Sequence, residues 1–140
     1  MPDFNDWNQG VIAEFRANEG RLSGGFAGAP MVLLHHVGRK SGKEYLTPLV
    51  YLPGDDDSIY IFASKGGAPV NPDWYGNLIA AGKATVEVGT STYQATVTEI
   101  SGDERDRLYA EQVKAMPGFG EYEQKTEGIR KIPVLRLTRG

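Results

Sequence analysis

The sequence predicts an α+β fold, a small barrel of five or six mostly antiparallel strands with two or three flanking helices. Short apolar segments are separated by turn residues, which indicates strands paired in hairpins. Amphipathic segments lie before, between and after these strands, which indicates helices packed around a sheet. The length of 140 residues suits a single domain over 1–140, because no repeat or linker divides the chain.

The first predicted element is a helix over residues 3–18. Large apolar side chains recur there at three- and four-residue spacing, the period of one helix face: Phe4, Trp7, Val11 and Phe15. A helix lying on a membrane surface is the alternative, but the polar face is mostly acidic and anionic lipid would repel it. Packing on the domain is therefore favoured, and peripheral membrane contact stays open.

The remaining elements follow in chain order. Strands are predicted at 31–37, 45–52, 58–64, 83–89, 91–100 and 131–138, and further helices at 71–82 and 101–116. The helix after the third strand has Asn71 as its cap, Pro72 at its first position and Gly82 as its stop. Residues 117–130 are expected to form a connector.

Composition and charge exclude several classes of protein. The formal net charge is −3, from 15 basic and 18 acidic residues, which argues against general nucleic-acid binding. There is no cysteine, so disulfides and thiolate metal sites are excluded. Apolar runs such as "MVLL" fall far short of the roughly 18 residues of a membrane span, and the N-terminus lacks a signal core. These features predict a cytoplasmic protein.

A concentrated group of cations follows the first strand in "GRKSGK". Its two glycines are separated by three residues, whereas the phosphate-binding P-loop needs four, so that motif is excluded. Backbone N–H groups in a glycine turn still favour anion binding, with Arg39 and Lys40 as charged donors and Ser41 as a neutral one. A solvated hairpin tip is the alternative.

A second cluster lies in "FASKGGAPVNPDWYGN". Ser64 and Lys65 end a strand shortly before a helix N-terminus, which is another potential anion site. Asp73 counts against a vacant anion pocket there, because it already complements the helix dipole. Trp74 stands four residues before Leu78, a spacing that is equally typical of a helix's core face.

Metal ligands and nucleophiles are poorly represented. His35 and His36 are adjacent on a predicted strand, so their side chains point to opposite faces, and no third ligand accompanies them. We expect one interior histidine, one exposed histidine and no metal. There is no G-x-S-x-G nucleophile elbow either. The pattern indicates a binding scaffold whose chemistry comes from a molecule it holds.

Taken together, three stretches resemble the deazaflavin-dependent nitroreductase family. They are "EFRANEGRLSGGFAGAPMVLLHHVGRKSGKEYLTPLVYL", "ASKGGAPVNPDWYGNL" and "IPVLRLT", and the similarity runs from about residue 10 to 138. The resemblance implies a split β-barrel related to flavin-nucleotide-binding barrels. It also implies binding of reduced coenzyme F420 and hydride transfer to a quinone or nitro-compound.

The same resemblance implies the site residues. Arg39, Lys40 and Ser41 would hold the coenzyme's phosphodiester and oligoglutamate tail, with Lys65 as a further anion contact. The deazaflavin would be lined or covered by Tyr45, Leu46, Thr47, Pro48, Leu49, Val50, Phe62, Ala63, Ser64, Asp73, Trp74, Tyr75, Gly76 and Asn77. Tyr122 would border the acceptor pocket and orient a quinone oxygen.

Two other functions remain open at this stage. The first is a split-barrel oxidoreductase that binds FMN. The second is a carrier that binds the coenzyme or a tetrapyrrole without turnover. The sequence does not identify the physiological acceptor or the oligomeric state.

Overall fold

The computed structural model describes residues 4–18, 30–54, 58–64, 67 and 70–139, with side chains in the first helix from residue 10 onward. Within these residues the helices are α1 (Phe4–Ala17), α2 (Asp73–Ala81), α3 (Gly102–Ala115) and α4 (Gly118–Thr126). The strands are β1 (Met31–Val37), β2 (Glu44–Val50), β3 (Leu52–Pro53), β4 (Ser58–Phe62), β5 (Lys83–Val88), β6 (Ser91–Ile100) and β7 (Val134–Arg139). The predicted α+β class is confirmed.

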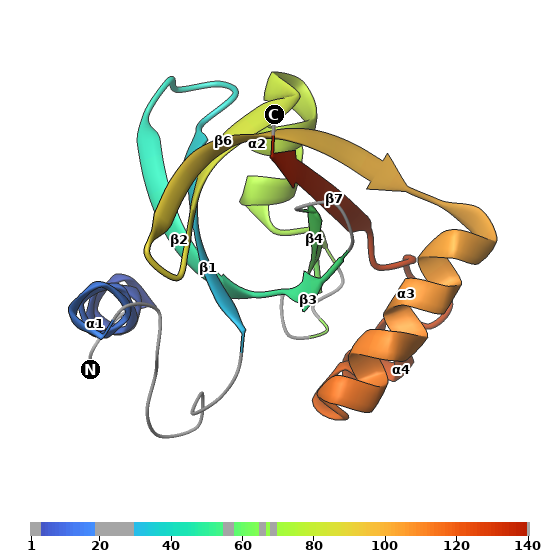
Figure 1. The fold of residues 1–140 in the computed structure, drawn as a ribbon. Coiled ribbons are helices and arrows are strands. Elements are labelled where there is room, and N and C mark those ends of the chain that lie inside the picture. Colours follow the sequence, from blue (N-terminus) through green and yellow to red (C-terminus); the bar gives the residue numbers. More distant parts are fainter. Residues whose placement is uncertain (1–3, 19–29, 55–57, 65–66, 68–69, 140) are drawn as a thin grey trace.

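These seven strands form one sheet in the order β2-β1-β5-β6-β7-β4-β3, which curls strongly (Figure 1). Each neighbouring pair is antiparallel, as predicted. The prediction of five or six strands is wrong because the segment 45–52 divides at Tyr51. Its first part pairs with β1 and its last part with β4, where Leu52 lies opposite Tyr60. The chain therefore passes directly from one edge of the sheet to the other.

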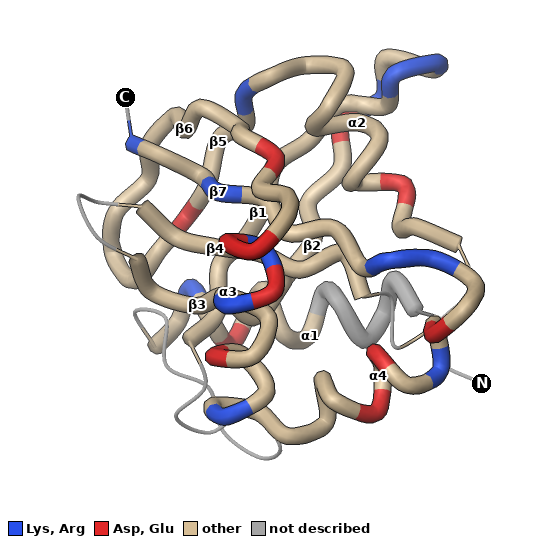
Figure 2. The backbone as a smooth tube through the Cα atoms, turned by 90° about the vertical axis from the view of Figure 1, so that its right-hand side faces the viewer, with Lys and Arg blue, Asp and Glu red and all other residues tan. Residues whose placement is uncertain are grey.

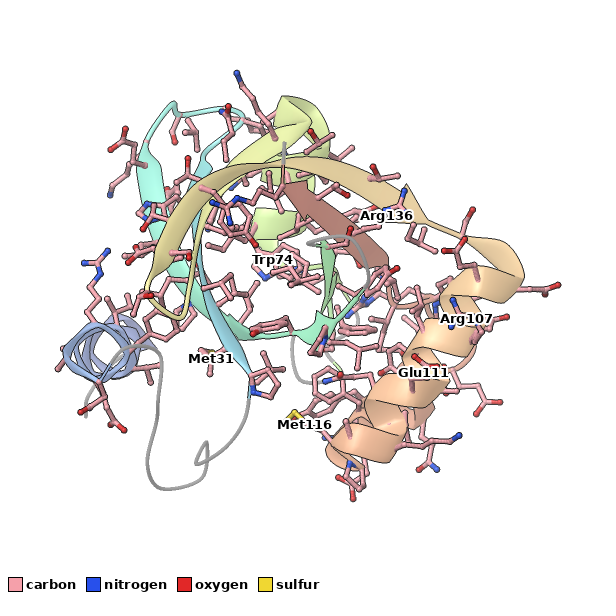
Figure 3. The ribbon with its side chains drawn as sticks, viewed as in Figure 1. Met31, Trp74, Arg107, Glu111, Met116 and Arg136 are labelled. Atoms are coloured by element: carbon pink, nitrogen blue, oxygen red, sulfur yellow. The ribbon has the colours of Figure 1, made fainter. Side chains whose placement is uncertain are left out.

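The inside of the curl is filled by apolar side chains from β1, β4, β5, β6 and β7. Trp74 and Leu78 of α2 belong to this cluster, and Figure 3 shows Trp74 pointing into the curl. The core interpretation of Trp74 is thus confirmed. The helix begins one residue later than predicted, with Pro72 as its cap residue, and stops at Gly82, whose φ of 73° is left-handed. One side of α2 is in this way held against the sheet.

The outer face of the sheet carries the other helices (Figure 1). Ile12 and Phe15 of α1 pack on β1, whereas α3 and α4 pack on β4 and β7. The expected connector 117–130 is wrong over most of its length, because Phe119 and Tyr122 lie three residues apart and form the apolar face of α4. No helix in the described ranges is long and apolar enough to cross a membrane.

An ion-pair cluster attaches α1 to the sheet. Arg16 donates two hydrogen bonds to the carboxylate of Glu87 on β5, at 3.1 and 2.7 Å. The Nε2 atom of His35 lies 2.7 Å from the same carboxylate. The hydrogen bond from Arg16 is the main reason that the pKa of Glu87 is lowered from 4.5.

Replacing Glu87 with glutamine is expected to lower the free energy of unfolding by about 1 kcal/mol at neutral pH, since Arg16 is half exposed. Because the folded pKa of Glu87 is lowered, the stabilisation is complete above pH 4.5 and is lost as the pH falls through the folded pKa. Thermal unfolding of both proteins along a pH series checks this. A difference that stays constant into acid would contradict the ion-pair explanation.

Candidate functional site

The basic turn between β1 and β2 is closed by its own hydrogen bonds. The N–H of Gly38 donates to the carbonyl of Lys43 at 2.8 Å, and the N–H of Gly42 donates to the carbonyl of Gly38 at 2.9 Å. Gly42 has a left-handed φ of 71°, which other residues adopt only at a cost. The Oγ atom of Ser41 accepts the Lys43 N–H at 3.2 Å. The turn therefore has a defined shape.

Arg39 is anchored to α2. Its backbone N–H and its Nη1 both donate to Oδ1 of Asn77, at 3.1 and 2.9 Å, and Nη1 also donates to the carbonyl of Asp73 at 3.2 Å. A Cβ on Gly76 would lie 2.7 Å from Cζ of Arg39, so the glycine provides the space for the guanidinium. Arg39 is exposed, but it is anchored to α2 as well as solvated. Its Nε and Nη2 have no partner among the described residues.

His36 continues this network into the fold. Its Nδ1 lies 3.0 Å from Nδ2 of Asn77 and its Nε2 lies 3.0 Å from Oγ1 of Thr47 on β2. Its ring stacks on Tyr45 with centroids 5.4 Å apart. Burial is the main reason that the pKa of His36 is lowered from 6.5. The prediction that the two histidines face opposite sides is confirmed, because His35 points to the outer face of the sheet, where it contacts Glu87 in the ion-pair cluster with Arg16.

A pocket of about 360 Å³ opens beside this network. It is lined by His36 and Gly38 and by six predicted site residues: Arg39, Lys40, Ser41, Tyr45, Asp73 and Asn77. We call it the basic pocket, because two cations oppose one carboxylate. Basic and acidic positions are interspersed over the molecule as a whole (Figure 2), so the excess is local. A second pocket of about 340 Å³ shares His36, Tyr45 and Asn77 with it.

The predicted residues of β2 are divided between the two faces of the sheet. Thr47 reaches His36, and Leu49 packs against the inner core. Leu46 and Val50 pack on the opposite side, against the cluster under α1. Pro48 is buried. The structure therefore does not bring all six residues of the segment 45–50 to one surface.

The other predicted residues that the structure describes lie outside the basic pocket. Phe62 packs edge-to-face on Tyr109 and Phe119, and Ala63 is fully buried. The hydroxyl of Tyr75 donates to the carboxylate of Glu99 at 2.9 Å. Lys65 lies outside the described residues.

Tyr122 lies on α4, on the outer side of the sheet. Its ring packs on Phe119 with centroids 5.2 Å apart. Its backbone lies close to Gly67, since a Cβ there would be 3.2 Å from Cα of Tyr122. This places Tyr122 beside Gly67 and not in the basic pocket.

One connecting residue was missed by the sequence reasoning. Arg130 donates through Nη1 to the carbonyl of Ala63 at 3.0 Å and to Oδ1 of Asn71 at 2.7 Å, and through Nη2 to the carbonyl of Ser64 at 2.9 Å. It thereby joins the end of β4 to the segment before α2. A lone arginine in a predicted connector gave no signal of this.

A larger pocket of about 630 Å³ lies between α3, α4 and the chain before β7, away from the predicted residues. Its lining contains three cations and three carboxylates: Arg105, Arg130, Lys131, Asp106, Glu123 and Glu127. The buried Arg105 is already bonded to the carbonyl of Ile132 and to two carboxylates. Because the positive and negative charges of this lining are equal in number, and its buried arginine already has partners, the pocket does not attract a polyanion. The described residues contain no cluster of potential metal ligands.

The fold and the site define a class of small α+β proteins with a curled antiparallel sheet and a cationic pocket at the end of two of its strands. A family model described as F420H(2)-dependent quinone reductase matches residues 7–139. The chain belongs to this family.

Known relatives agree with this assignment. One Mycobacterium tuberculosis relative is 36% identical over 84% of this chain and 97% of its own length. Another from that organism, named F420H(2)-dependent quinone reductase, is 34% identical over 91% of this chain and 86% of its own length. A solved structure of an F420-H2 dependent reductase is 36% identical and covers 77% of this chain and 93% of its own, with a TM-score of 0.68.

Proposed function

We propose that this chain is a coenzyme F420-dependent reductase that transfers a hydride from the reduced coenzyme to a quinone or nitro-compound. Membership of the F420H(2)-dependent quinone reductase family supports this proposal. We also propose that its curled sheet is a split β-barrel, because the two edge strands are joined through a single residue, Tyr51. The family match names coenzyme F420 and gives no support to the FMN alternative.

The basic pocket carries the proposal, because its donor set fits the phosphodiester and glutamates of the coenzyme. Arg39 offers Nε and Nη2, Lys40 offers its ammonium group, and Ser41 offers its hydroxyl proton. Lys43 lies at the far end of the same turn, with its Nζ 5.9 Å from the ring centre of Tyr45. A pocket of about 360 Å³ suits the phosphate region and the start of a tail rather than the whole coenzyme.

The bound coenzyme would supply a hydride, and a quinone that accepts it takes up one proton to become the hydroquinone. The chain's own contribution is placement. The turn and α2 would fix the anionic part, and Thr47 and Asn77 would lie at the inner side of the site. We propose that Tyr122 borders the acceptor and donates a hydrogen bond to its oxygen.

Replacing Tyr122 with phenylalanine is expected to lower quinone turnover by about 2- to 10-fold, the value of one ordinary hydrogen bond. Coenzyme affinity should not change, since Tyr122 lies outside the basic pocket. Stability should not change either, because the Tyr122 hydroxyl has no hydrogen-bond partner among the described residues. Steady-state oxidation of reduced coenzyme by menadione measures turnover.

Tyr109→Phe is the matched control in the same aromatic cluster. The buried hydroxyl of Tyr109 donates to the carbonyl of Phe119 at 2.7 Å, so its removal should cost about 1 kcal/mol of stability. Turnover should stay near that of the wild type. A parallel loss of coenzyme binding in Tyr122→Phe would show that Tyr122 contacts the coenzyme and not the acceptor.

The function itself is tested by two measurements on the wild-type protein. Fluorescence titration with coenzyme F420 and with FMN should show binding of the first and much weaker binding of the second. Menadione should then oxidise the reduced coenzyme at a rate proportional to protein concentration. Binding without turnover would favour a carrier, and preference for FMN would overturn the assignment.

A further inference from the structure

The orientation of one buried amide is fixed by chemistry alone. Asn77 is 4% exposed, and its Oδ1 lies within hydrogen-bond distance of the backbone N and of Nη1 of Arg39. A backbone N–H and a guanidinium can only donate. Oδ1 must therefore face Arg39, because the reversed amide would bring an NH₂ group against two donors. The Nδ2 of Asn77 must then donate to Nδ1 of His36 at 3.0 Å.

This orientation fixes the state of His36. Because Nδ1 accepts a hydrogen bond, it carries no proton, and a neutral imidazole then carries its proton on Nε2. Nε2 therefore donates to Oγ1 of Thr47 at 3.0 Å. The Thr47 hydroxyl uses one lone pair for this bond, and its own proton has no acceptor among the described residues. The direction of every donor from Arg39 to Thr47 is thus determined.

We propose that His36 is the positioning residue of this site: its neutral Nε2–H form holds Asn77, which holds the Arg39 guanidinium, and it ties this pair to Thr47 on β2. The role in coenzyme binding rests on the proposed function. The hydrogen-bond chain itself does not. His36 lies on β1 and contacts both Thr47 on β2 and Asn77 on α2, so one side chain keeps the anion-binding end and the inner end of the site in register.

Protonation of His36 disrupts this chain of hydrogen bonds. An imidazolium carries protons on both nitrogens, so Nδ1–H would oppose Nδ2–H of Asn77. Turning the amide round would relieve that contact but place Nδ2 against both donors of Arg39. We therefore expect coenzyme affinity to fall as the pH drops below 6.5 through the lowered pKa of His36. Because the folded pKa of His36 is lowered, the neutral ring also stabilises the fold above pH 6.5, and this stabilisation is lost as the pH falls through the folded pKa.

The groups around His36 do not change the direction of this effect. The carboxylate of Asp73 on α2 favours the charged ring, whereas burial and His35 on β1 oppose it, and burial is the largest influence. The other charged or titratable groups that line the two adjoining pockets are Arg39, Lys40, Glu44, Tyr45 and Lys83. A simple charge account predicts the opposite trend, since a cationic His36 would attract the anionic coenzyme more strongly at low pH.

The tautomer can be measured without coenzyme. The chain has two histidines, so ring ¹⁵N resonances are assigned by comparison with His35→Asn. We expect His36 at pH 7 to be neutral with its proton on Nε2, and to titrate below 6.5. A proton on Nδ1, or a charged ring at pH 7, would overturn the proposal.

Two matched variants separate the hydrogen bond of His36 to Asn77 from its hydrogen bond to Thr47. His36→Asn places an amide oxygen near the position of Nδ1 and keeps an acceptor for Asn77. His36→Gln places its amide near Nε2, so it can keep the contact with Thr47 but loses that acceptor. We expect His36→Gln to bind coenzyme about 2- to 10-fold more weakly than His36→Asn, at the value of one hydrogen bond. Both variants lose the ring, so their comparison cancels the loss of stacking on Tyr45.

Fluorescence titration between pH 5 and 7 gives the deciding pattern. Wild-type affinity should fall with decreasing pH beyond any fall in His36→Asn, which reports the titration of the coenzyme's own acids. Tighter wild-type binding at low pH, or equal affinities of the two variants, would overturn the positioning role. If no coenzyme binds to the wild type, the proposed function fails, and the tautomer measurement still decides the state of His36.

Discussion

Replacing Arg39 with alanine is expected to weaken binding of coenzyme F420 by about 10- to 100-fold. Charge-assisted hydrogen bonds to the coenzyme's anionic groups are worth roughly 1.5–3 kcal/mol, and a tenfold change in affinity is about 1.4 kcal/mol. The loss should be larger at low salt, because partly exposed charges are screened over about 8 to 10 Å near physiological ionic strength. Stability should fall by about 1 kcal/mol, since two side-chain contacts to α2 are lost.

Two controls separate the charge from its position. Lys40→Ala removes a cation that lines the pocket but does not anchor the turn, so affinity should fall while stability stays unchanged. Gly76→Ala keeps every charge, but its methyl group displaces the Arg39 guanidinium. Alanine favours a helix interior over glycine by up to about 1 kcal/mol, so this variant should bind more weakly without being less stable. Wild-type affinity in both Arg39→Ala and Gly76→Ala at low salt would contradict the role of Arg39.

Replacing Asn77 with leucine is expected to have the largest combined effect. The amide is buried, and its removal leaves the Arg39 N–H and the His36 Nδ1 without their partner. An unsatisfied buried polar group costs about 1–3 kcal/mol, which chemical denaturation can measure. Coenzyme affinity should fall as in Arg39→Ala, because the guanidinium loses its main anchor.

Asn77→Asp provides the comparison. A carboxylate keeps the acceptor for Arg39 but cannot donate to His36, so it should raise the pKa of His36 above that in the wild type. The stability gained from such a pair is present at low pH and is lost as the pH rises through the raised pKa. Asn77→Asp should therefore be less destabilised at pH 5 than at pH 8. An effect that does not depend on pH would show that Asn77 and His36 are not coupled.

Much of the fold could be predicted because its signals are local. The stop at Gly82 and the antiparallel hairpins follow from residues that stand next to each other in the sequence. Two errors have tertiary causes. The segment 45–52 looks like one strand, and only the closure of the sheet divides it at Tyr51. Helix α4 is rich in glycine and glutamate, and it depends on the burial of Phe119 against α3 and β4.

The residues of the basic pocket could be predicted in part, because some of their signals are also local. The cations of the turn and the motif around Asn77 are visible as clusters, and the structure brings them together at one pocket. The partners of His36 stand 11 and 41 residues away from it, so only topology reveals them. Arg39 was predicted as a tail contact, and its second role as an anchor on α2 depends on a glycine that happens to face it.

The central claim is that the basic pocket recognises the anionic part of coenzyme F420. The most direct measurement compares intact coenzyme with its deazaflavin fragment that lacks the phosphodiester and glutamates, by fluorescence titration of the wild type and Arg39→Ala at low salt. We predict that the wild type prefers the intact coenzyme and that Arg39→Ala loses about 10- to 100-fold for it while binding the fragment as the wild type does. An equal loss for both ligands, or no preference in the wild type, would contradict the claim.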